Sequence, residues 1–365
     1  MKIAIDRERL FSALTAVKDC VSNDGPVALK SILIETKDDD KIVLTSTNLT
    51  QVISTEASAR VVAPGSIAVP ARFFQAAVGV LTSPIVEFDS DDSGIDKAVL
   101  RGGDVTYKFS ALKADEFPKA AQVAGKAITL GGDAVRRMFS RVAYSAATDM
   151  TRRSLCGVLL DGSNGAIKSV ATDGRRMSVA KTTCEGKFVF KVIVPNATVK
   201  MINKIVSPKD KVCIKVGEDA IVLESDGWSL QTKLIDEAYP DYSKPVDSAK
   251  TDKEAVVSRD ELISSIEQAS VSSDTTTPRV TMLFADGALF LTASDAAISD
   301  SRSTIPVRYG GEKVALDVNP HYIIDIMSSL GADEVKLLFK DGGSPIVVES
   351  ETDDFIGIVM PLRIN

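Results

Sequence analysis

A segment of about 120 residues occurs three times along this chain, and this repetition constrains the fold more than any other feature. In each copy an alternating apolar and polar stretch, typical of a strand, runs into a Thr/Ser–Asn/Asp turn and continues as a second alternating stretch. The turns lie at Asn48, Asp173 and Asp295. A period of this length is that of a whole domain rather than of a solenoid repeat.

Two further elements repeat in step with these turns. A short strand runs into a helix through a proline or capping turn at Val69-Pro70, Val194-Pro195 and Asn319-Pro320. Each copy is also predicted to open with a helix, because apolar residues recur at helical spacing near its start. These stripes are Leu10, Ala13, Leu14 and Val17 in the first copy, Val135, Met138, Phe139 and Val142 in the second, and Leu262, Ile266 and Ala269 in the third.

The repeat predicts an α+β protein of three domains, each with two helices packed on antiparallel strands. We place the domains at residues 1–125, 126–250 and 251–365. The stretches at 122–127 and 248–254 are small, polar and without strong periodicity, as expected of domain boundaries.

Motifs for catalysis or for a bound cofactor are missing from the sequence. His321 is the single histidine, so a site built from several histidines is excluded; its position predicts the first turn of an amphipathic helix. Neither a phosphate-binding loop nor a dinucleotide-binding glycine pattern occurs. The acidic segments Asp38–Asp40 and Asp89–Gly94 are predicted to be turns, and the second lacks the glutamate that completes a calcium loop, since position 100 is leucine. We therefore expect no catalytic residue, metal or cofactor, and an unrecognised carboxylate enzyme has no motif in its support.

The cysteines and the hydropathy pattern indicate a cytosolic protein without a membrane segment. The four cysteines, at positions 20, 156, 184 and 213, are too far apart for a zinc knuckle or redox pair and are expected to be reduced core thiols. Charged residues follow the N-terminus at once, and no apolar run approaches the ~20 residues that cross a bilayer.

Charge is distributed unevenly over the three copies. The whole chain has a formal net charge of −7, which by itself argues against nucleic acid as a partner. The central copy is nevertheless basic while the other two are acidic, and part of its excess falls on predicted helices and on one predicted loop. These basic residues are Arg136, Arg137, Arg141, Lys200 and Lys204 on helices and Arg152-Arg153 in the loop. A solvated helix face and a contact with phosphates explain this pattern equally well.

Three motifs, in this order and spacing, resemble the bacterial DNA polymerase III beta subunit family, the sliding clamps. They are Ala171-Thr172-Asp173-Gly174-Arg175-Arg176-Met177, Tyr239-Pro240-Asp241-Tyr242 and Val359-Met360-Pro361-Leu362-Arg363-Ile364. The three-copy organisation matches along the whole chain, and Val69-Pro70-Ala71-Arg72 fits as well.

The resemblance implies a DNA-clamp fold in which two protomers join head to tail into a closed ring of six domains. Helices would line the hole and sheets would form the outside, so that the ring encircles duplex DNA without reading its sequence and without catalysis. It would confer processivity on the replicative polymerase. The implied partners are double-stranded DNA, a second copy of the chain, the DNA polymerase III alpha subunit, the clamp loader, other polymerases and repair proteins, in the bacterial cytoplasm at the nucleoid.

The resemblance also implies three sets of site residues. A groove between the second and third copies would bind short apolar peptide motifs through Arg152, Leu155, Thr172, Gly174, Arg175, Arg176, Met177, Pro240, Val246, Tyr322, Met360, Pro361, Leu362 and Arg363. DNA would be contacted by Arg72, Arg136, Arg137, Arg141, Arg152, Arg153, Lys200 and Lys204. The dimer interface would use Tyr107 and Phe109, on a candidate edge strand at 106–110, against Val271, Ser272 and the strand near 295–302 of the other copy.

The sequence departs from the family pattern at several places. Arg175 replaces a common histidine, Ser154 stands where an aromatic residue is expected, and Asn196-Ala197 stands where some members have a basic pair. Asn365 is an additional residue after Ile364. Two alternatives remain open: the apolar groove residues are plain core, and the chain is a clamp-like scaffold that binds peptides without encircling DNA.

Overall fold

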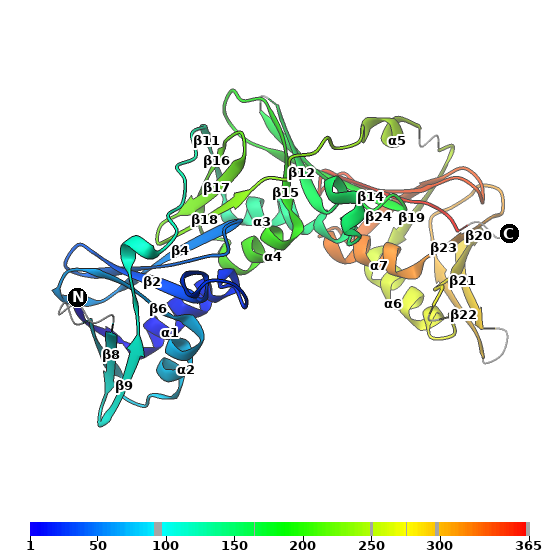
Figure 1. The fold of residues 1–365 in the computed structure, drawn as a ribbon. Coiled ribbons are helices and arrows are strands. Elements are labelled where there is room, and N and C mark those ends of the chain that lie inside the picture. Colours follow the sequence, from blue (N-terminus) through cyan, green and yellow to red (C-terminus); the bar gives the residue numbers. More distant parts are fainter. Residues whose placement is uncertain (91–96, 164, 249–250, 275, 296–298, 363–365) are drawn as a thin grey trace. The chain divides into compact units, whose positions relative to one another are not determined.

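The computed structural model describes residues 1–90, 97–163, 165–248, 251–274, 276–295 and 299–362. Their helices and antiparallel strands come in three successive sets that follow the sequence repeat (Figure 1). In each set the common order is strand, helix, three strands, a fourth strand, a second helix and three more strands. The prediction of an α+β fold with two helices and antiparallel sheets in each repeat is confirmed, and the central repeat has one further short helix, α5.

The elements of each repeat have the following bounds. The first contains β1 (Lys2–Asp6), α1 (Arg7–Val17), β2 (Ser31–Lys37), β3 (Lys41–Thr47), β4 (Gln51–Ser58), β5 (Arg60–Ala63), β6 (Ser66–Pro70), α2 (Ala71–Val80), β7 (Ile85–Ser90), β8 (Lys97–Gly102), β9 (Val105–Ser110) and β10 (Leu112–Lys113). The central repeat contains β11 (Lys126–Gly131), α3 (Gly132–Ser140), β12 (Gly157–Ser163), β13 (Ala166–Thr172), β14 (Arg176–Thr183), β15 (Phe190–Pro195), α4 (Asn196–Ile205), β16 (Lys211–Val216), β17 (Ala220–Ser225), β18 (Trp228–Lys233) and α5 (Ser243–Ser248). The third contains β19 (Lys253–Ser258), α6 (Arg259–Ser270), β20 (Val280–Ala285), β21 (Ala288–Asp295), β22 (Ser299–Pro306), β23 (Val314–Val318), α7 (Pro320–Ser329), β24 (Glu334–Phe339), β25 (Ile346–Ser350) and β26 (Phe355–Val359).

One expectation about the repeat was wrong: each copy opens with a strand, not with a helix. The strands β1, β11 and β19 precede α1, α3 and α6 directly. They have five or six residues, and β1 buries only Ile3 and Ile5 fully, so the alternation is too short to stand out in the sequence.

The helices form where the sequence places caps and apolar stripes. The carboxylate of Asp6 caps α1 by accepting a hydrogen bond from the amide of Arg9 at 2.9 Å, and Asn319 caps α7 in the same way through the amide of His321 at 3.0 Å. The predicted stripes are buried along α1, α3 and α6, although Val142 lies two residues beyond the end of α3, and His321 lies exposed in the first turn of α7, as predicted.

The repeated turns have the predicted chemistry. The side chain of Asn48 accepts hydrogen bonds from the amides of Thr50 and Gln51, and that of Asp173 accepts them from Arg175 and Arg176. Such Asx turns let a short polar side chain close a hairpin. The triple-aspartate segment also forms a hairpin tip, between β2 and β3. The predicted turn at Asp89–Gly94 lies outside the described residues after Ser90.

The chain divides into two compact units, whose boundaries fall within the central repeat and do not coincide with the three repeats. One unit comprises Met1–Asp133 and Lys200–Leu234, and the other comprises Ala134–Val199 and Ile235–Asn365. The first unit holds a five-stranded sheet, β5-β1-β7-β8-β9, and a nine-stranded sheet, β10-β6-β2-β3-β4-β18-β17-β16-β11. The second holds an eight-stranded sheet, β15-β12-β13-β14-β26-β25-β24-β19, and a four-stranded sheet, β22-β21-β20-β23.

Apart from β5 and β10, these sheets are built from six modules of four strands, two from each repeat. One module type has the order β6-β2-β3-β4, repeated as β15-β12-β13-β14 and β23-β20-β21-β22. The other has the order β9-β8-β7-β1, repeated as β18-β17-β16-β11 and β26-β25-β24-β19. Pairing of β4 with β18 and of β14 with β26 joins successive repeats, while β9 and β22 are left at sheet edges.

Candidate functional site

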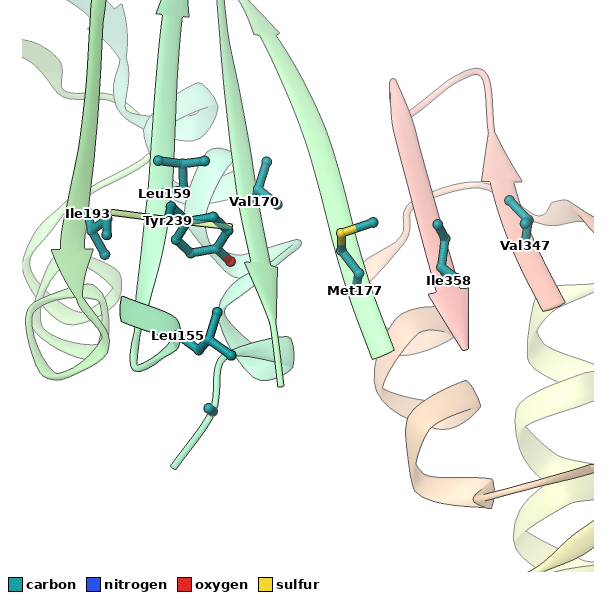
Figure 2. Packing of buried hydrophobic residues seen from close by; sticks show 9 residues of the cluster. Leu155, Leu159, Val170, Met177, Ile193, Tyr239, Val347 and Ile358 are labelled. Atoms are coloured by element: carbon teal, nitrogen blue, oxygen red, sulfur yellow. The ribbon is translucent and has the colours of Figure 1, made fainter. Parts of the chain in front are cut away.

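An apolar cluster lies on the eight-stranded sheet where the central and third repeats meet. The pairing of β14 with β26 places Met177 opposite Ile358, two residues that are far apart in the sequence. Figure 2 shows Met177, Ile358 and Val347 side by side on adjacent strands and a second group around Tyr239. Ser178 follows Met177 on β14, so its side chain points to the other face of the sheet, where its hydroxyl forms hydrogen bonds with Tyr144 and Ser145. The cluster therefore occupies the face turned away from these contacts.

The predicted groove residues take different positions around this cluster. Leu155 and Met177 belong to it and are buried, and Val246 of α5 packs against it half-buried. Thr172, Arg176, Tyr322, Pro361 and Leu362 are also half-buried. The exposed members of the predicted set are Arg152, Gly174, Arg175, Pro240 and Met360. Arg363 lies outside the described residues.

A hollow of about 390 Å³ opens beside the cluster, under α5. Its apolar wall includes Val179, Tyr242, Val246 and Ile356, and lysines and glutamates form its rim. Only Val246 of the predicted set lines it. The sequence reasoning missed Val179, Ile356 and Ile358, although strand alternation offered a signal: Val179 is two residues from Met177, and Ile358 is two residues from Met360.

The hairpin turn at 172–176 is held by its own hydrogen bonds. The Thr172 hydroxyl donates to the carbonyl of Arg176 at 2.7 Å and accepts from the amide of Gly174 at 3.1 Å. Gly174 has a φ of +87°, and a Cβ there would lie 3.1 Å from a guanidinium nitrogen of Arg152. Glycine is therefore required both by the left-handed backbone and by the approach of Arg152.

The segment after β26 is tied to both repeats by backbone hydrogen bonds. The amide of Met360 donates to the carbonyl of Arg175 at 2.9 Å, and the amide of Leu362 donates to that of Asp317 at 2.7 Å. The side chain of Met360 is 43% exposed. This anchoring leaves a flexible thioether at the surface beside the 172–176 turn, where it can adapt to an apolar ligand.

Arg176 has a structural role that the sequence did not reveal. Its guanidinium donates to the carboxylates of Asp173 at 3.2 Å and Asp325 at 2.5 Å, and to the carbonyl of Tyr144 at 2.5 Å. It also lies 4.6 Å from the ring centroid of Tyr322. These contacts use the guanidinium to join the turn to α7, so the expectation that Arg176 holds polar atoms of a peptide is replaced by a role in positioning the turn.

Arg141 is likewise engaged inside the protein, and we withdraw it from the DNA-contacting set. Its side chain is only 13% exposed. The guanidinium forms an ion pair with the carboxylate of Asp353 and donates to the carbonyl of the same residue at 2.5 Å. Asp353 also accepts hydrogen bonds from the amides of Gly331 and Ala332 and from the Ser350 hydroxyl. Burial lowers the pKa of Arg141, an effect that the carboxylate of Asp353 opposes.

The other predicted DNA-contacting residues lie at or near the surface. Arg137, Lys200 and Lys204 are exposed on α3 and α4, and Arg136 is half-buried. Lys204 forms an ion pair with Asp19 at 2.5 Å. Arg72 is exposed on α2, as are Arg152 and Arg153 in a short 3-10 segment at Met150–Leu155. The sequence reasoning missed two exposed basic residues beside or within α1, Arg9 and Lys18.

The helices of the third repeat offer little positive charge. Arg259 of α6 is tied to Asp260 at 2.8 Å and donates to the carbonyl of Leu330. The first turn of α6 is acidic. Of the helices described, those of the first and central repeats therefore provide the basic surface.

The predicted interface residues lie on or near sheet edges. Tyr107 and Phe109 are half-buried on the edge strand β9. The ring of Phe109 packs edge-on against that of Phe74 of α2, with 5.5 Å between the ring centroids. Val271 is 84% exposed, but Ser272 is 6% exposed, so the side chain of Ser272 has almost no surface to offer a partner.

Nothing in the described part of the chain resembles a metal or redox site. No group of three or more His, Cys, Asp or Glu side chains that could hold a metal ion occurs there. The four cysteines are free, and burial raises the pKa of the Cys20 thiol to about 12. Among these residues, no helix is long and apolar enough to cross a bilayer.

Comparison with known proteins identifies the family. Models of the DNA polymerase III beta subunit match the chain at residues 1–121 (N-terminal domain), 129–241 (central domain) and 248–363 (C-terminal domain). Beta sliding clamps of Chlamydia pneumoniae and Vibrio cholerae are 28% and 26% identical over 370 residues, covering all of both chains. Solved structures with full coverage of both chains include a sliding clamp from Bacillus subtilis (TM-score 0.94, 21% identity) and one from Pseudomonas aeruginosa bound to griselimycin (TM-score 0.93, 24% identity). The chain therefore belongs to the DNA polymerase III beta subunit family, the beta sliding clamps.

Proposed function

We propose that two copies of this chain pair head to tail into a closed ring that encircles duplex DNA and gives processivity to the replicative polymerase. Members of the family are non-catalytic, and the proposed function requires no catalysed reaction. One observation carries it: two of three equivalent repeat junctions are closed by strand pairing within the chain, and the strands of the third, β9 and β22, are free edges. Pairing β9 of one copy with β22 of another, at both ends, closes a ring of six repeats.

The unpaired edges themselves favour this assembly. An exposed strand edge presents unpaired N–H and C=O groups and invites association with another chain. Pairing of β9 with β22 within a ring satisfies both of these edges. We also propose that the repeats at 1–125, 126–250 and 251–365 are the domains of this ring, because each contributes one sheet module of each type.

The DNA contact that we propose is electrostatic. Arg72, Arg136, Arg137, Lys200 and Lys204 lie on helices of the first and central repeats, and Arg152 and Arg153 on the 3-10 segment. Contacts of lysine and arginine with phosphates carry no sequence information, so they attract duplex DNA without stopping its passage. The location that follows is the bacterial cytoplasm, at the nucleoid.

A topological link gives the sharpest test. The protein is loaded by a clamp loader onto nicked circular DNA, and the complex is separated by gel filtration before and after linearisation. We expect retention on the circle and loss after cutting, because a ring leaves through a free end. Equal retention on both forms would refute encirclement. A stable monomer in sedimentation would instead favour the alternative, a scaffold that binds peptides without encircling DNA.

We further propose that the surface around the apolar cluster binds short apolar peptide motifs of polymerases, the clamp loader and repair proteins. Leu155 and Met177 are buried beneath this surface, exposed Met360 lies at its rim, and the hollow beside Val246 admits an apolar side chain. Flexible methionines suit a surface that accepts different apolar anchors.

The peptide site is tested with a fluorescent peptide carrying leucine and phenylalanine anchors. Met360→Ala is expected to weaken its binding several-fold, because a partly exposed apolar contact is lost. The matched control is Val62→Ala, which removes an apolar side chain of similar exposure, 56%, from β5. Equal affinity for the wild type and both variants would refute the assignment.

A further inference from the structure

The two repeat junctions within the chain share a single strand register. In the first, Thr232 lies opposite Gln51 and Trp228 opposite Thr55. In the second, Val359 lies opposite Arg176 and Phe355 opposite Ala180. Gln51 and Arg176 are each the third residue after the turn residues Asn48 and Asp173. Trp228 and Phe355 are each the first paired residue of the last strand in the repeat.

The same landmarks exist on the two free edges. Val105 is the first paired residue of β9, opposite Gly102, and therefore corresponds to Trp228 and Phe355. On β22, Ser299 pairs with the turn residue Asp295. Ser299 therefore corresponds to Gln51, whose carbonyl accepts a hydrogen bond from the amide of the turn residue Asn48. In the sequence, the turn of the third repeat is one residue longer than that of the first.

From this equivalence we infer the register in which β9 of one copy pairs with β22 of a second copy. Ser299 lies opposite Phe109 and Ser303 opposite Val105, with the intervening pairs Asp300–Lys108, Ser301–Tyr107 and Arg302–Thr106. The inference rests on the proposed ring and adds to it the residue contacts of the closing junction, above all an ion pair between Lys108 and Asp300 of opposite copies.

Side-chain direction supports this register independently. Phe109 packs on α2, and the ring of Tyr107 stacks beside that of Phe109, with 6.3 Å between the ring centroids. Both side chains therefore point to the helix-covered face of their sheet. The Ser301 hydroxyl donates to the carbonyl of Ala269 in α6, so it also points to the helix-covered face. Opposed residues of paired strands share a face, and the inferred register satisfies this rule. A shift by one residue would place Tyr107 opposite a residue of the other face.

Lys108 and Asp300 then meet on the outer face. Both residues are exposed, and neither has an ion-pair partner among the described residues of its own chain. The corresponding outer-face pair is Val52 with Gln231 at the first junction and Met177 with Ile358 at the second. The outer-face pairs of the three junctions therefore differ in chemistry: the first is uncharged, the second is apolar and belongs to the proposed peptide surface, and the third, which joins separate copies, has opposite charges.

Charge exchange tests the ion pair. Lys108→Glu should raise the dimer dissociation constant roughly ten-fold at low salt, since two junctions each lose an attraction and gain a repulsion. Adding Asp300→Lys should restore most of the affinity, and Asp300→Lys alone should weaken it as Lys108→Glu does. Lys211→Glu is the matched control, with the same charge change on an exposed residue of β16. Failure of the double variant to recover would overturn the pairing.

Cysteine cross-linking tests the register separately from the ring. Thr106→Cys combined with Arg302→Cys should form a disulfide-linked dimer under mild oxidation. Thr106→Cys combined with Thr304→Cys, on the same face but two residues out of register, should link far less. Preferential linkage through residue 304 in a stable dimer would refute the register while leaving the ring intact. A chain that stays monomeric by sedimentation would refute the proposed ring itself.

Discussion

Replacement of Arg141 with leucine tests whether this residue serves stability or DNA binding. In the structure its guanidinium connects the segment after α3 to the turn between β25 and β26 through Asp353. The two side chains are 13% and 6% exposed, so the pair is shielded from solvent. Removing the arginine leaves a buried carboxylate without its cation.

The size of the effect follows from what remains around that carboxylate. Breaking a buried ion pair by removing one partner costs about 3–5 kcal/mol. Asp353 keeps three hydrogen bonds, from the amides of Gly331 and Ala332 and from the Ser350 hydroxyl, which compensate part of the loss. We therefore expect a loss near the lower end, about 3 kcal/mol. For a cooperative unit of about 200 residues this lowers the Tm by roughly 6–12 °C.

Thermal unfolding and DNA binding are measured on the same preparations at one protein concentration, because ring assembly makes Tm depend on concentration. Arg141→Leu should lower the Tm and leave the salt dependence of DNA binding unchanged below the transition. Lys200→Ala, exposed on α4, is the contrasting variant: its stability should change by less than about 0.5 kcal/mol, while DNA binding weakens. An Arg141→Leu protein with wild-type Tm and weaker DNA binding would refute the reasoning.

Three further outcomes are expected. Arg176→Lys should destabilise the protein by about 2 kcal/mol and weaken peptide binding, since lysine cannot bond several acceptors as a planar guanidinium does; wild-type unfolding curves would contradict this. Burial raises the pKa of Tyr144 from 10.0 to about 12, so the stability contributed by the neutral phenol is present below pH 10 and lost as pH rises toward 12. Tyr144→Phe should therefore lose less unfolding free energy between pH 10 and 12 than the wild type, and the same loss in both proteins, measured by chemical denaturation at each pH, would rule this out. Gly174→Ala should cost about 1 kcal/mol at its left-handed φ and displace Arg152, so peptide affinity falls; a crystal structure with Arg152 in place would argue against that displacement.

Local patterns in the sequence determined much of this protein. The three Asn or Asp turns, the strand-to-helix corners and the buried helix stripes follow from hydrogen bonding and periodicity between near neighbours. The order of repeats and their motifs identified the family. Even there, β1, β11 and β19 escaped notice, because strands with so few fully buried side chains leave little periodicity.

Contacts between distant residues were decided only by the tertiary structure. The sequence presents Arg141 and Arg176 as basic residues like any other, but strand pairing and helix packing bring acidic partners to both. Met177 and Ile358 become one surface only when β14 pairs with β26. Charge in a sequence shows how many cations a repeat carries. Which of them stay available for DNA depends on carboxylates supplied from far along the chain, because ion pairing acts through space.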